Sequence, residues 1–370
     1  MAARTNIMKE RMVVPQPTVW ILVLVWVIAS SSGFSTSSSS SFPQLTPVQE
    51  TSLLVAYWRH LETISAPYHS KNAPFSPPLI HDLYATTLVD TLLPKKRQIE
   101  LDESPIRDAG RDILAVRTKC IDDWLLLRDK EDGSASAAAA AVDADKNGKP
   151  CRQLVNLGAG MCARYYRLLL GPSMLSTIIY DHVWEVDSDL ELLQIKHQVL
   201  QQQQQQQGDD EGTLRQPPKK NNADRLTKLT MLPGDLTNLT PLATALRSSG
   251  LDCDNKPTDW MVEGVLEYLD PHHHLPILQF TKSLSKPGSR MALQVLDESL
   301  REYFQTTLGL QQPMPWKEVP GLDVFIDLAV RPSGWEVERV VRPTDWNDCY
   351  ERDLSHIPGF YIVFLKLLPP

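Results

Sequence analysis

The sequence has few basic residues and few cysteines for its length of 370 residues. Lys and Arg number 37 against 45 Asp and Glu, which gives a net charge of −8. A nucleic-acid-binding protein normally presents clustered positive charge, so this balance argues against a nucleic acid as partner. The five cysteines show no CxxC spacing, and neither a disulfide framework nor a zinc site is expected. With 42% hydrophobic and 22% charged residues, the chain is expected to be globular.

Acidic residues are absent between Glu10 and Glu50, and this segment predicts a leader over residues 1–45. Basic residues precede an apolar run, Val19–Ala29, which is shorter than the roughly 20 residues that span a bilayer. We therefore expect a secretory signal, with no stable membrane span in the mature form. Phe34 and a run of serines follow, and this arrangement resembles a bipartite plastid leader. The alternatives are another secretory fate and an uncleaved membrane anchor.

The rest of the chain, residues 46–370, is predicted to form a single domain. Apolar residues at helical spacing in Val48–Ile64, His81–Leu93 and Ser104–Arg128 predict a helical cap over residues 46–130. Two low-complexity inserts are expected as loops, the Ala-rich 131–149 and the Gln-rich 201–224. The favoured interpretation of the Gln tract itself is an extension of the preceding helix that frays into a linker, and a partner-binding role is the alternative.

Strand-like and helix-like segments alternate after residue 150, and this pattern predicts an α/β fold with a doubly wound, mostly parallel sheet. The last two strands have no room for a crossover helix, so we expect an antiparallel C-terminal ending. The expected strands are Leu154–Gly158, His182–Asp187, Leu229–Leu232, Trp260–Val265, Met291–Leu296, Trp335–Val341 and Phe360–Leu367.

A glycine turn follows the first of these strands. Gly158, Gly160 and Ala163 form G-x-G-x-x-A at the start of the expected helix Cys162–Leu170. Such a turn lets the backbone approach a ligand closely. Asp187 ends the next strand, where an acid commonly accepts hydrogen bonds from a ribose. Nicotinamide and S-adenosylmethionine enzymes both use this geometry, and a tight turn beside a solvated acid is the structural alternative.

Further acids follow the later strands. Asp235 and Leu236 follow the third strand, where they are placed to hold an adenine, and Glu263 is expected at the end of the fourth, beside the switch point of the sheet. Taken alone, such acids also fit the rules for helix caps: Asp235 precedes Leu239–Leu246, and Asp270 precedes the helix opened by Pro271.

Together these segments resemble the motifs of the leucine carboxyl methyltransferase family. The matching stretches keep the family's order along the chain. They are residues 153–167, Trp184–Asp187, Pro233–Leu236 and Trp260–Leu269, with Val116–Asp123 upstream. The resemblance implies a Rossmann-like class I methyltransferase sheet and S-adenosyl-L-methionine as the cofactor.

The resemblance also implies a role for each matching residue. Arg117 is expected on the cofactor carboxylate and Glu263 near its amine, because a guanidinium and a carboxylate match these two charges. The remaining cofactor residues implied are Gly158 and Gly160 at the methionine part, Asp187 at the ribose, and Asp235 and Leu236 at the adenine. Cys162 and Ala163 stand where the family usually has Asp-Thr.

Candidates for the acceptor side are less specific. By resemblance Tyr268 lines the methyl site, and His81 and Asp82 belong to a segment similar to the bacterial-type branch. The alternative for Tyr268 is a packed aromatic ring. The alternative for His81 and Asp82 is a surface turn at the start of a helix. No metal is expected, because adjacent residues of a helix such as His272, His273 and His274 point in different directions.

These observations predict an O-methyltransferase that acts on a carboxylate or hydroxyl of a small molecule. The family's other branch methylates the C-terminal leucine of protein phosphatase 2A, so a peptide end is the alternative acceptor. A non-catalytic scaffold is a further hypothesis, and a nicotinamide dehydrogenase is a weaker one because the sequence has no evident Tyr-x-x-x-Lys.

Overall fold

The computed structural model describes residues 47–65, 68–70, 73–76, 78–104, 106–126, 152–170, 180–210, 227–308, 316–317, 320–350, 352 and 354–369. The predicted leader at 1–45 and the Ala-rich tract at 131–149 lie outside these residues. Within the described residues, no helix combines the length and the apolar character needed to cross a membrane.

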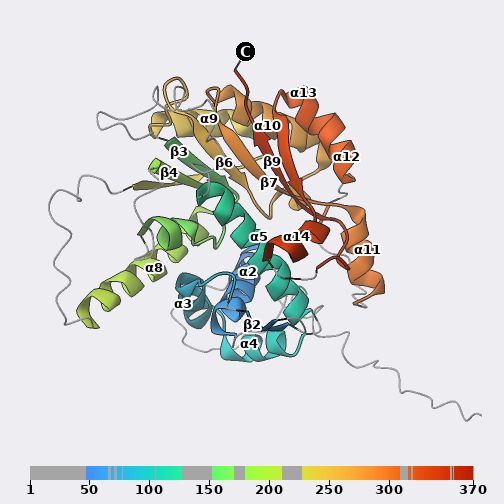
Figure 1. Ribbon diagram of the computed structural model, residues 1–370. Helices are drawn as coiled ribbons and strands as arrows, with labels where there is room; N and C mark the ends of the chain where they lie inside the picture. The colour runs from blue at the N-terminus through green and yellow to red at the C-terminus, as the bar shows by residue number, and fades with distance from the viewer. Residues whose placement is uncertain are drawn as a thin grey trace, which may run out of the picture.

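A seven-stranded sheet forms the centre of the protein (Figure 1). Its strand order is β5-β4-β3-β6-β7-β9-β8, in which β3 to β7 run parallel while β9 runs antiparallel to both β7 and β8. The strands are β3 (Arg152–Leu157), β4 (Tyr180–Asp187), β5 (Lys228–Pro233), β6 (Thr258–Val262), β7 (Arg290–Leu296), β8 (Glu336–Val341) and β9 (Phe360–Lys366). From β3 the chain continues to β4 and β5 on one side of the sheet and then returns to β6 and β7 on the other side. The switch point of the sheet therefore lies between β3 and β6.

The sheet confirms the predicted fold class, including the antiparallel C-terminal ending. Each expected strand is present, with bounds that shift by a few residues. The main difference is β6, which ends at Val262, so that Glu263 begins the following loop. A separate hairpin of β1 (Tyr68–Ser70) and β2 (Ala73–Ser76) was not predicted.

The central strands β3, β6 and β7 are buried on both faces, since alternate residues point to opposite sides and both sets are covered. On one face Trp184, Trp260 and Val363 pack in one core cluster, and on the other Met261 and Phe364 pack in a second. The elements around the strands are η2 (Tyr165–Leu170), α9 (Leu239–Ser248), η4 (Leu266–Tyr268), η5 (Pro271–His273), α10 (His274–Ser283), α11 (Glu298–Thr306), α12 (Leu322–Phe325), η6 (Ile326–Val330), α13 (Arg331–Ser333) and α14 (Pro343–Tyr350). The predicted helix Cys162–Leu170 is thus confined to Arg164 and the π-helical turn η2.

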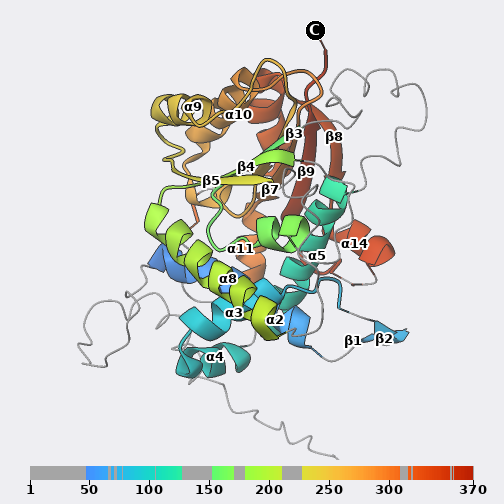
Figure 2. The ribbon, with the colours of Figure 1, turned by 90° about the vertical axis from the view of Figure 1, so that its left-hand side faces the viewer.

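The N-terminal helices form a cap on the sheet. They are α2 (Pro47–Ile64), α3 (Leu83–Leu92), α4 (Lys95–Asp102) and α5 (Arg107–Leu126). Figures 1 and 2 both show α2, α3 and α4 together on one side of the sheet. Leu53 and Tyr57 of α2 share a core cluster with Met161, Ala163 and Tyr166, so the cap packs directly on the segment after β3. Helix α4 was not predicted because its sequence is almost entirely polar.

The Gln tract is the end of a helix, which confirms the expected helix extension, so the first part of the 201–224 insert is not a loop. Helix α8 runs from Leu190 to Asp210 and includes all seven consecutive glutamines. Gln has a high helix propensity, so the helix extends into the tract. Residues 211–224 lie outside the described part.

Truncation of Trp260 tests the importance of the central strands. Its side chain is fully buried and its Nε1 donates to Ser285 Oγ at 2.7 Å. We expect Trp260→Ala to lower the free energy of unfolding by about 3–5 kcal/mol, because it leaves a cavity and removes the hydrogen bond to Ser285. Denaturant unfolding measures this change. Leu328→Ala, at a side chain that is 67% exposed, is the control and should change stability by less than about 0.5 kcal/mol; equal effects of the two substitutions would contradict the assignment.

Candidate functional site

The glycine turn connects β3 to Arg164 and lies between β4 and the cap. Gly158 and Gly160 have φ of +71° and +42°, and an added Cβ would lie 2.9 Å from Val265 and 2.8 Å from Ser52 Oγ, respectively. Glycine is therefore required at both positions by conformation and by space. The Gly160 N–H donates to Asp187 Oδ2 at 2.9 Å. The turn and the acid at the end of β4 thus form one unit, as the sequence predicts.

Two buried cations hold the second half of this turn. Arg59 of α2 donates to the Met161 carbonyl at 2.8 Å, and Lys196 of α8 donates to the Cys162 carbonyl at 3.1 Å. Lys196 is fully buried and forms an ion pair with Glu185 of β4 at 2.8 Å. The sequence interpretation missed both cations. A signal for Lys196 existed, since it lies among the apolar residues on the buried face of α8.

A continuous chain of buried ion pairs and hydrogen bonds joins the cap to the sheet, and we refer to it as the arginine network. None of its side chains is more than 13% exposed. Its links are, in order, Arg59–Asp82 (3.1 Å), Asp82–Arg167 (3.5 Å), Arg167–Asp122, Asp122–Arg164 (2.7 Å), Arg164–Glu263, Glu263–Arg117 (2.6 Å), Arg117–Gln294 (2.6 Å) and Gln294–Glu267 (3.1 Å).

Arg117 and Glu263 lie together at the switch point, as the sequence predicts. Arg117 Nε is 2.6 Å from Glu263 Oε1. Arg164, to which the sequence interpretation gave no role, contacts both oxygens of Glu263. Although burial raises the pKa of Glu263, Arg117 and Arg164 hold it at about 2, so the carboxylate is ionised at neutral pH. This pair offers one cation and one anion side by side, the arrangement that a zwitterionic amino acid requires.

Glu267 is a second buried carboxyl on the loop after β6, and the sequence interpretation passed over it. Gln294 of β7 donates to its Oε1 at 3.1 Å, while its Oε2 has no hydrogen-bond partner among the described residues. Burial raises the pKa of Glu267 to about 7, and the nearby Glu263 adds to the rise while Arg117 opposes it. Near neutral pH this carboxyl therefore exchanges a proton.

Asp235 and Leu236 lie after β5, at the same edge of the sheet. Asp235 is exposed, and its carboxylate accepts hydrogen bonds from the backbone and the hydroxyl of Thr237, which lower its pKa. Leu236 is buried in the core cluster that contains Trp184. Asp235 does not cap α9, whose N-cap is Asn238, so the helix-cap alternative for Asp235 is wrong.

The acceptor-side candidates are not brought together. Asp82 is the N-cap of α3, where it accepts from the Ala85 N–H at 3.0 Å, and its 1% exposed side chain is paired with Arg59 and Arg167. This geometry favours the alternative of a helix start over an acceptor-side role. His81 is exposed beside it. Tyr268 is on η4, and burial raises its pKa well above the ordinary value, so its phenol stays protonated at neutral pH.

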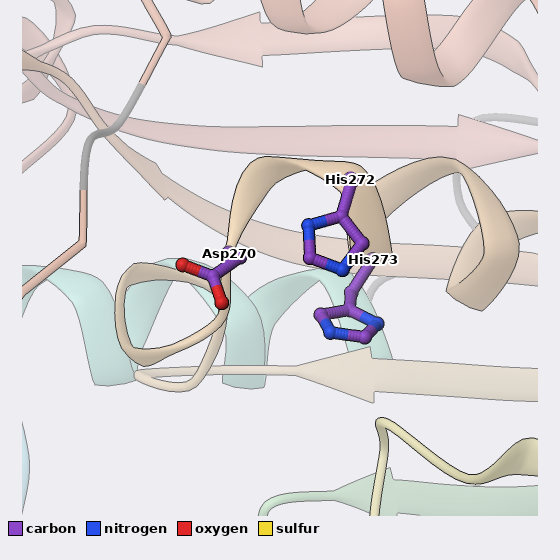
Figure 3. A group of neighbouring side chains, drawn as sticks. All are labelled: Asp270, His272 and His273. Carbon is purple, nitrogen blue, oxygen red and sulfur yellow. The ribbon is translucent and has the colours of Figure 1, made fainter.

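Asp270, His272 and His273 lie close together on the turn before α10 (Figure 3). One ligand atom of each lies within 4.8 Å of the others. His272 and His273 therefore lie together, contrary to the expectation that adjacent histidines point in different directions. His274 does point away, since it is buried against the Leu266 carbonyl. Asp270 and His272 are exposed, and Asp270 lies 3.7 Å from the ammonium of Lys317. We assign no metal to this group.

Comparison with known proteins identifies the family. The model of the family described as "Leucine carboxyl methyltransferase" matches residues 55–282. The chain belongs to the leucine carboxyl methyltransferase family. Among its relatives are proteins named "Putative S-adenosyl-L-methionine-dependent methyltransferase" from Mycolicibacterium gilvum and Mycobacterium marinum. Each is 29% identical, over 72% and 75% of this chain and over 78% and 74% of the relative.

Solved structures similar to this chain include a DUF574 family protein from Streptomyces avermitilis, with 16% identity and a TM-score of 0.42. That match covers 77% of this chain and 95% of the other. Another is a structure titled as a "putative methyltransferase" from Thermobifida fusca, with 13% identity and a TM-score of 0.44, covering 89% and 100%.

The family membership makes the chain an S-adenosyl-L-methionine-dependent methyltransferase, and the site fits this cofactor. The Arg117–Glu263 pair matches the charges of its carboxylate and ammonium. Asp187 is half-buried at the end of β4, next to the glycine turn. Cys162 and Ala163, which replace the family's usual Asp-Thr, do not open the turn, because Lys196 binds the Cys162 carbonyl.

Loss of Arg117 tests the proposed contact with the cofactor carboxylate. We expect Arg117→Ala to weaken binding of S-adenosylhomocysteine by about 2–4 kcal/mol, because it leaves a buried carboxylate unpaired. Isothermal titration calorimetry measures the affinity. The exposed Arg331→Ala serves as control, and unchanged affinity in Arg117→Ala would refute this role.

Glu267 should make stability depend on pH in the cofactor-free protein. Its pKa is raised in the folded state, so the unfolded chain loses this proton first as pH rises. Stability should therefore fall between about pH 4.5 and 7 and remain lower above. Relative to Glu267→Gln, the free energy of unfolding of the wild type should fall by up to about 3 kcal/mol between pH 4.5 and 8. Denaturant unfolding at each pH measures the difference, and parallel curves for the two proteins would contradict the raised pKa.

Proposed function

We propose that this enzyme transfers a methyl group from S-adenosyl-L-methionine to an oxygen of a small molecule, either a carboxylate or a hydroxyl. The observation that carries the proposal is the position of the cap. Helix α2 packs on the glycine turn, with Ser52 against Gly160 and Arg59 on the Met161 carbonyl. A site covered in this way suits a small acceptor or a chain end better than the folded surface of another protein.

Several observations support oxygen as the methylated atom. The name of the matching family specifies a carboxyl acceptor. A carboxylate is already ionised at neutral pH and needs no base, whereas a hydroxyl needs a proton acceptor within reach. Buried arginines favour an anionic oxygen near the site. The net charge of −8 supports the view that nucleic acid is not the acceptor.

The protein's part in the reaction is alignment and exclusion of water. When bound, the cofactor would supply a methyl group on a positively charged sulfur: an acceptor oxygen forms a bond to the methyl carbon in line as the carbon–sulfur bond breaks, and S-adenosylhomocysteine leaves as a neutral thioether. Arg117 and Glu263 would hold the amino-acid part by charge, and Asp187 would bind the ribose. The glycine turn, held by Arg59 and Lys196, would lie against the cofactor.

A methyl-transfer screen tests the proposal. The enzyme, with cofactor labelled in the methyl group, is incubated with a small-molecule extract, with simple carboxylic acids and phenols, and with a peptide ending in leucine. We expect label in a small product. Release of volatile methanol in mild alkali identifies a methyl ester, and resistance to alkali identifies a methyl ether.

Asp187→Ala, which loses the carboxylate expected at the ribose, is the negative control. If only the leucine peptide were labelled, the result would replace our proposal with methylation of the C-terminal leucine of a protein. Failure to bind the cofactor at millimolar concentration would instead support the non-catalytic scaffold.

A further inference from the structure

Glu267 is the carboxyl at the end of the arginine network. Along the network Asp82, Asp122 and Glu263 each contact two arginines, whereas the Glu267 carboxyl has no ion pair among the described residues and accepts from the Gln294 amide and its own backbone N–H. Glu267 is 4% exposed, and its Oε2 has no hydrogen-bond partner in the part of the chain that the structure describes. This carboxyl is therefore the member of the network whose charge is least fixed by its neighbours.

The charge of the network depends on whether Glu267 carries a proton. The four arginines exceed the three ion-paired carboxylates by one positive charge. With Glu267 protonated, this surplus is available to an incoming anion. With Glu267 ionised, the network is already neutral, and a further carboxylate gains much less from it.

The surplus charge and Glu267 face the same small space. An added Cβ at Gly264 would lie 3.7 Å from Arg117 Nη1 and 4.0 Å from Glu267 Oε1, and Gly264 has a φ of +69°. Both groups are therefore within van der Waals distance of the volume that a side chain at Gly264 would occupy. Gln294 bridges them, since it accepts from Arg117 and donates to Glu267.

Three titratable groups lie near the Glu267 carboxyl. They are Arg117 from α5, Glu263 from the loop after β6 and Tyr268 from η4, and Arg164 contacts Glu263. Lys317 donates its backbone N–H to the Glu267 carbonyl at 2.8 Å, but its ammonium is directed to Asp270. Burial raises the pKa of Glu267 to about 7, so its protonation changes within the range of ordinary assays.

We propose that Glu267 is a positioning residue that competes with the cofactor carboxylate for Arg117, so that the cofactor binds the form of the enzyme in which Glu267 is protonated. Binding is then accompanied by uptake of a proton from solvent by Glu267 at pH values above its midpoint. The proposal rests on the role given above to Arg117 and does not depend on the identity of the acceptor.

Calorimetric titration of the full chain with S-adenosylhomocysteine from pH 5.5 to 8.5 tests the proposal. We expect the wild-type affinity to fall on the order of tenfold between pH 6 and 8.5, because ionised Glu267 neutralises the surplus charge. In Glu267→Gln the affinity should stay nearly constant, and at pH 8.5 it should exceed that of the wild type on the order of tenfold.

Two controls isolate the carboxylate and the side chain. 5′-Methylthioadenosine has the same adenosine and thioether without the amino-acid part, so its affinity should depend on pH equally in wild type and Glu267→Gln. Glu298→Gln, at an exposed glutamate of α11, should behave as the wild type. Titration of the wild type at pH 7.5 in buffers of different ionisation enthalpy should show net proton uptake with S-adenosylhomocysteine but not with 5′-methylthioadenosine.

The outcomes separate the proposals from each other. Equal pH dependence of S-adenosylhomocysteine binding in wild type and Glu267→Gln, or proton uptake with both ligands, would overturn the role of Glu267. If the variant does not fold, the number of protons that the wild type takes up on binding each of the two ligands still tests the role of Glu267. Absence of S-adenosylhomocysteine binding at every pH would contradict the proposed function itself.

Discussion

The arginine network is the constraint on which the arrangement of this enzyme depends. Four guanidinium groups are buried, and a buried charge is tolerated only when an opposite charge and hydrogen bonds accompany it. Their partners come from the N-cap of α3, from α5, from β7 and from the loop after β6. The cap and the sheet therefore satisfy each other's charges, and breaking one buried pair would cost about 3–5 kcal/mol. The cap is thus an integral part of the domain.

This constraint also holds the residues of the proposed cofactor site in place. Arg117 and Glu263 are held in place by Gln294 and Arg164, so little side-chain freedom remains to be lost on binding. The glycine turn is fixed in a similar way, through carbonyls bound by Arg59 and Lys196. Both parts of the site are rigid because buried charges on neighbouring elements hold them.

The sequence predicts the sheet, its antiparallel ending and the residues at its carboxyl edge, because these leave local signals. Strand periodicity, the glycine turn and acids at strand ends can all be read within a few neighbouring residues. It did not predict Arg164, Lys196 or Glu267. Arg164 acquires its role from Glu263, 99 residues away, and the network reaches Glu267 through Gln294, which is 177 residues from Arg117. Such pairings depend on the assembled fold. Asp82 shows the converse, since a residue named by resemblance lies in the structure as the N-cap of α3.

The position of β9 has a consequence for biosynthesis. This strand follows β8 in the chain but lies between β7 and β8, so β8 has no partner in the sheet until β9 has been made. Until then β7 presents an unpaired edge, which is a template for pairing with other chains. The nascent enzyme is therefore most exposed to aggregation in the interval between synthesis of β7 and arrival of β9, when chaperones would protect it.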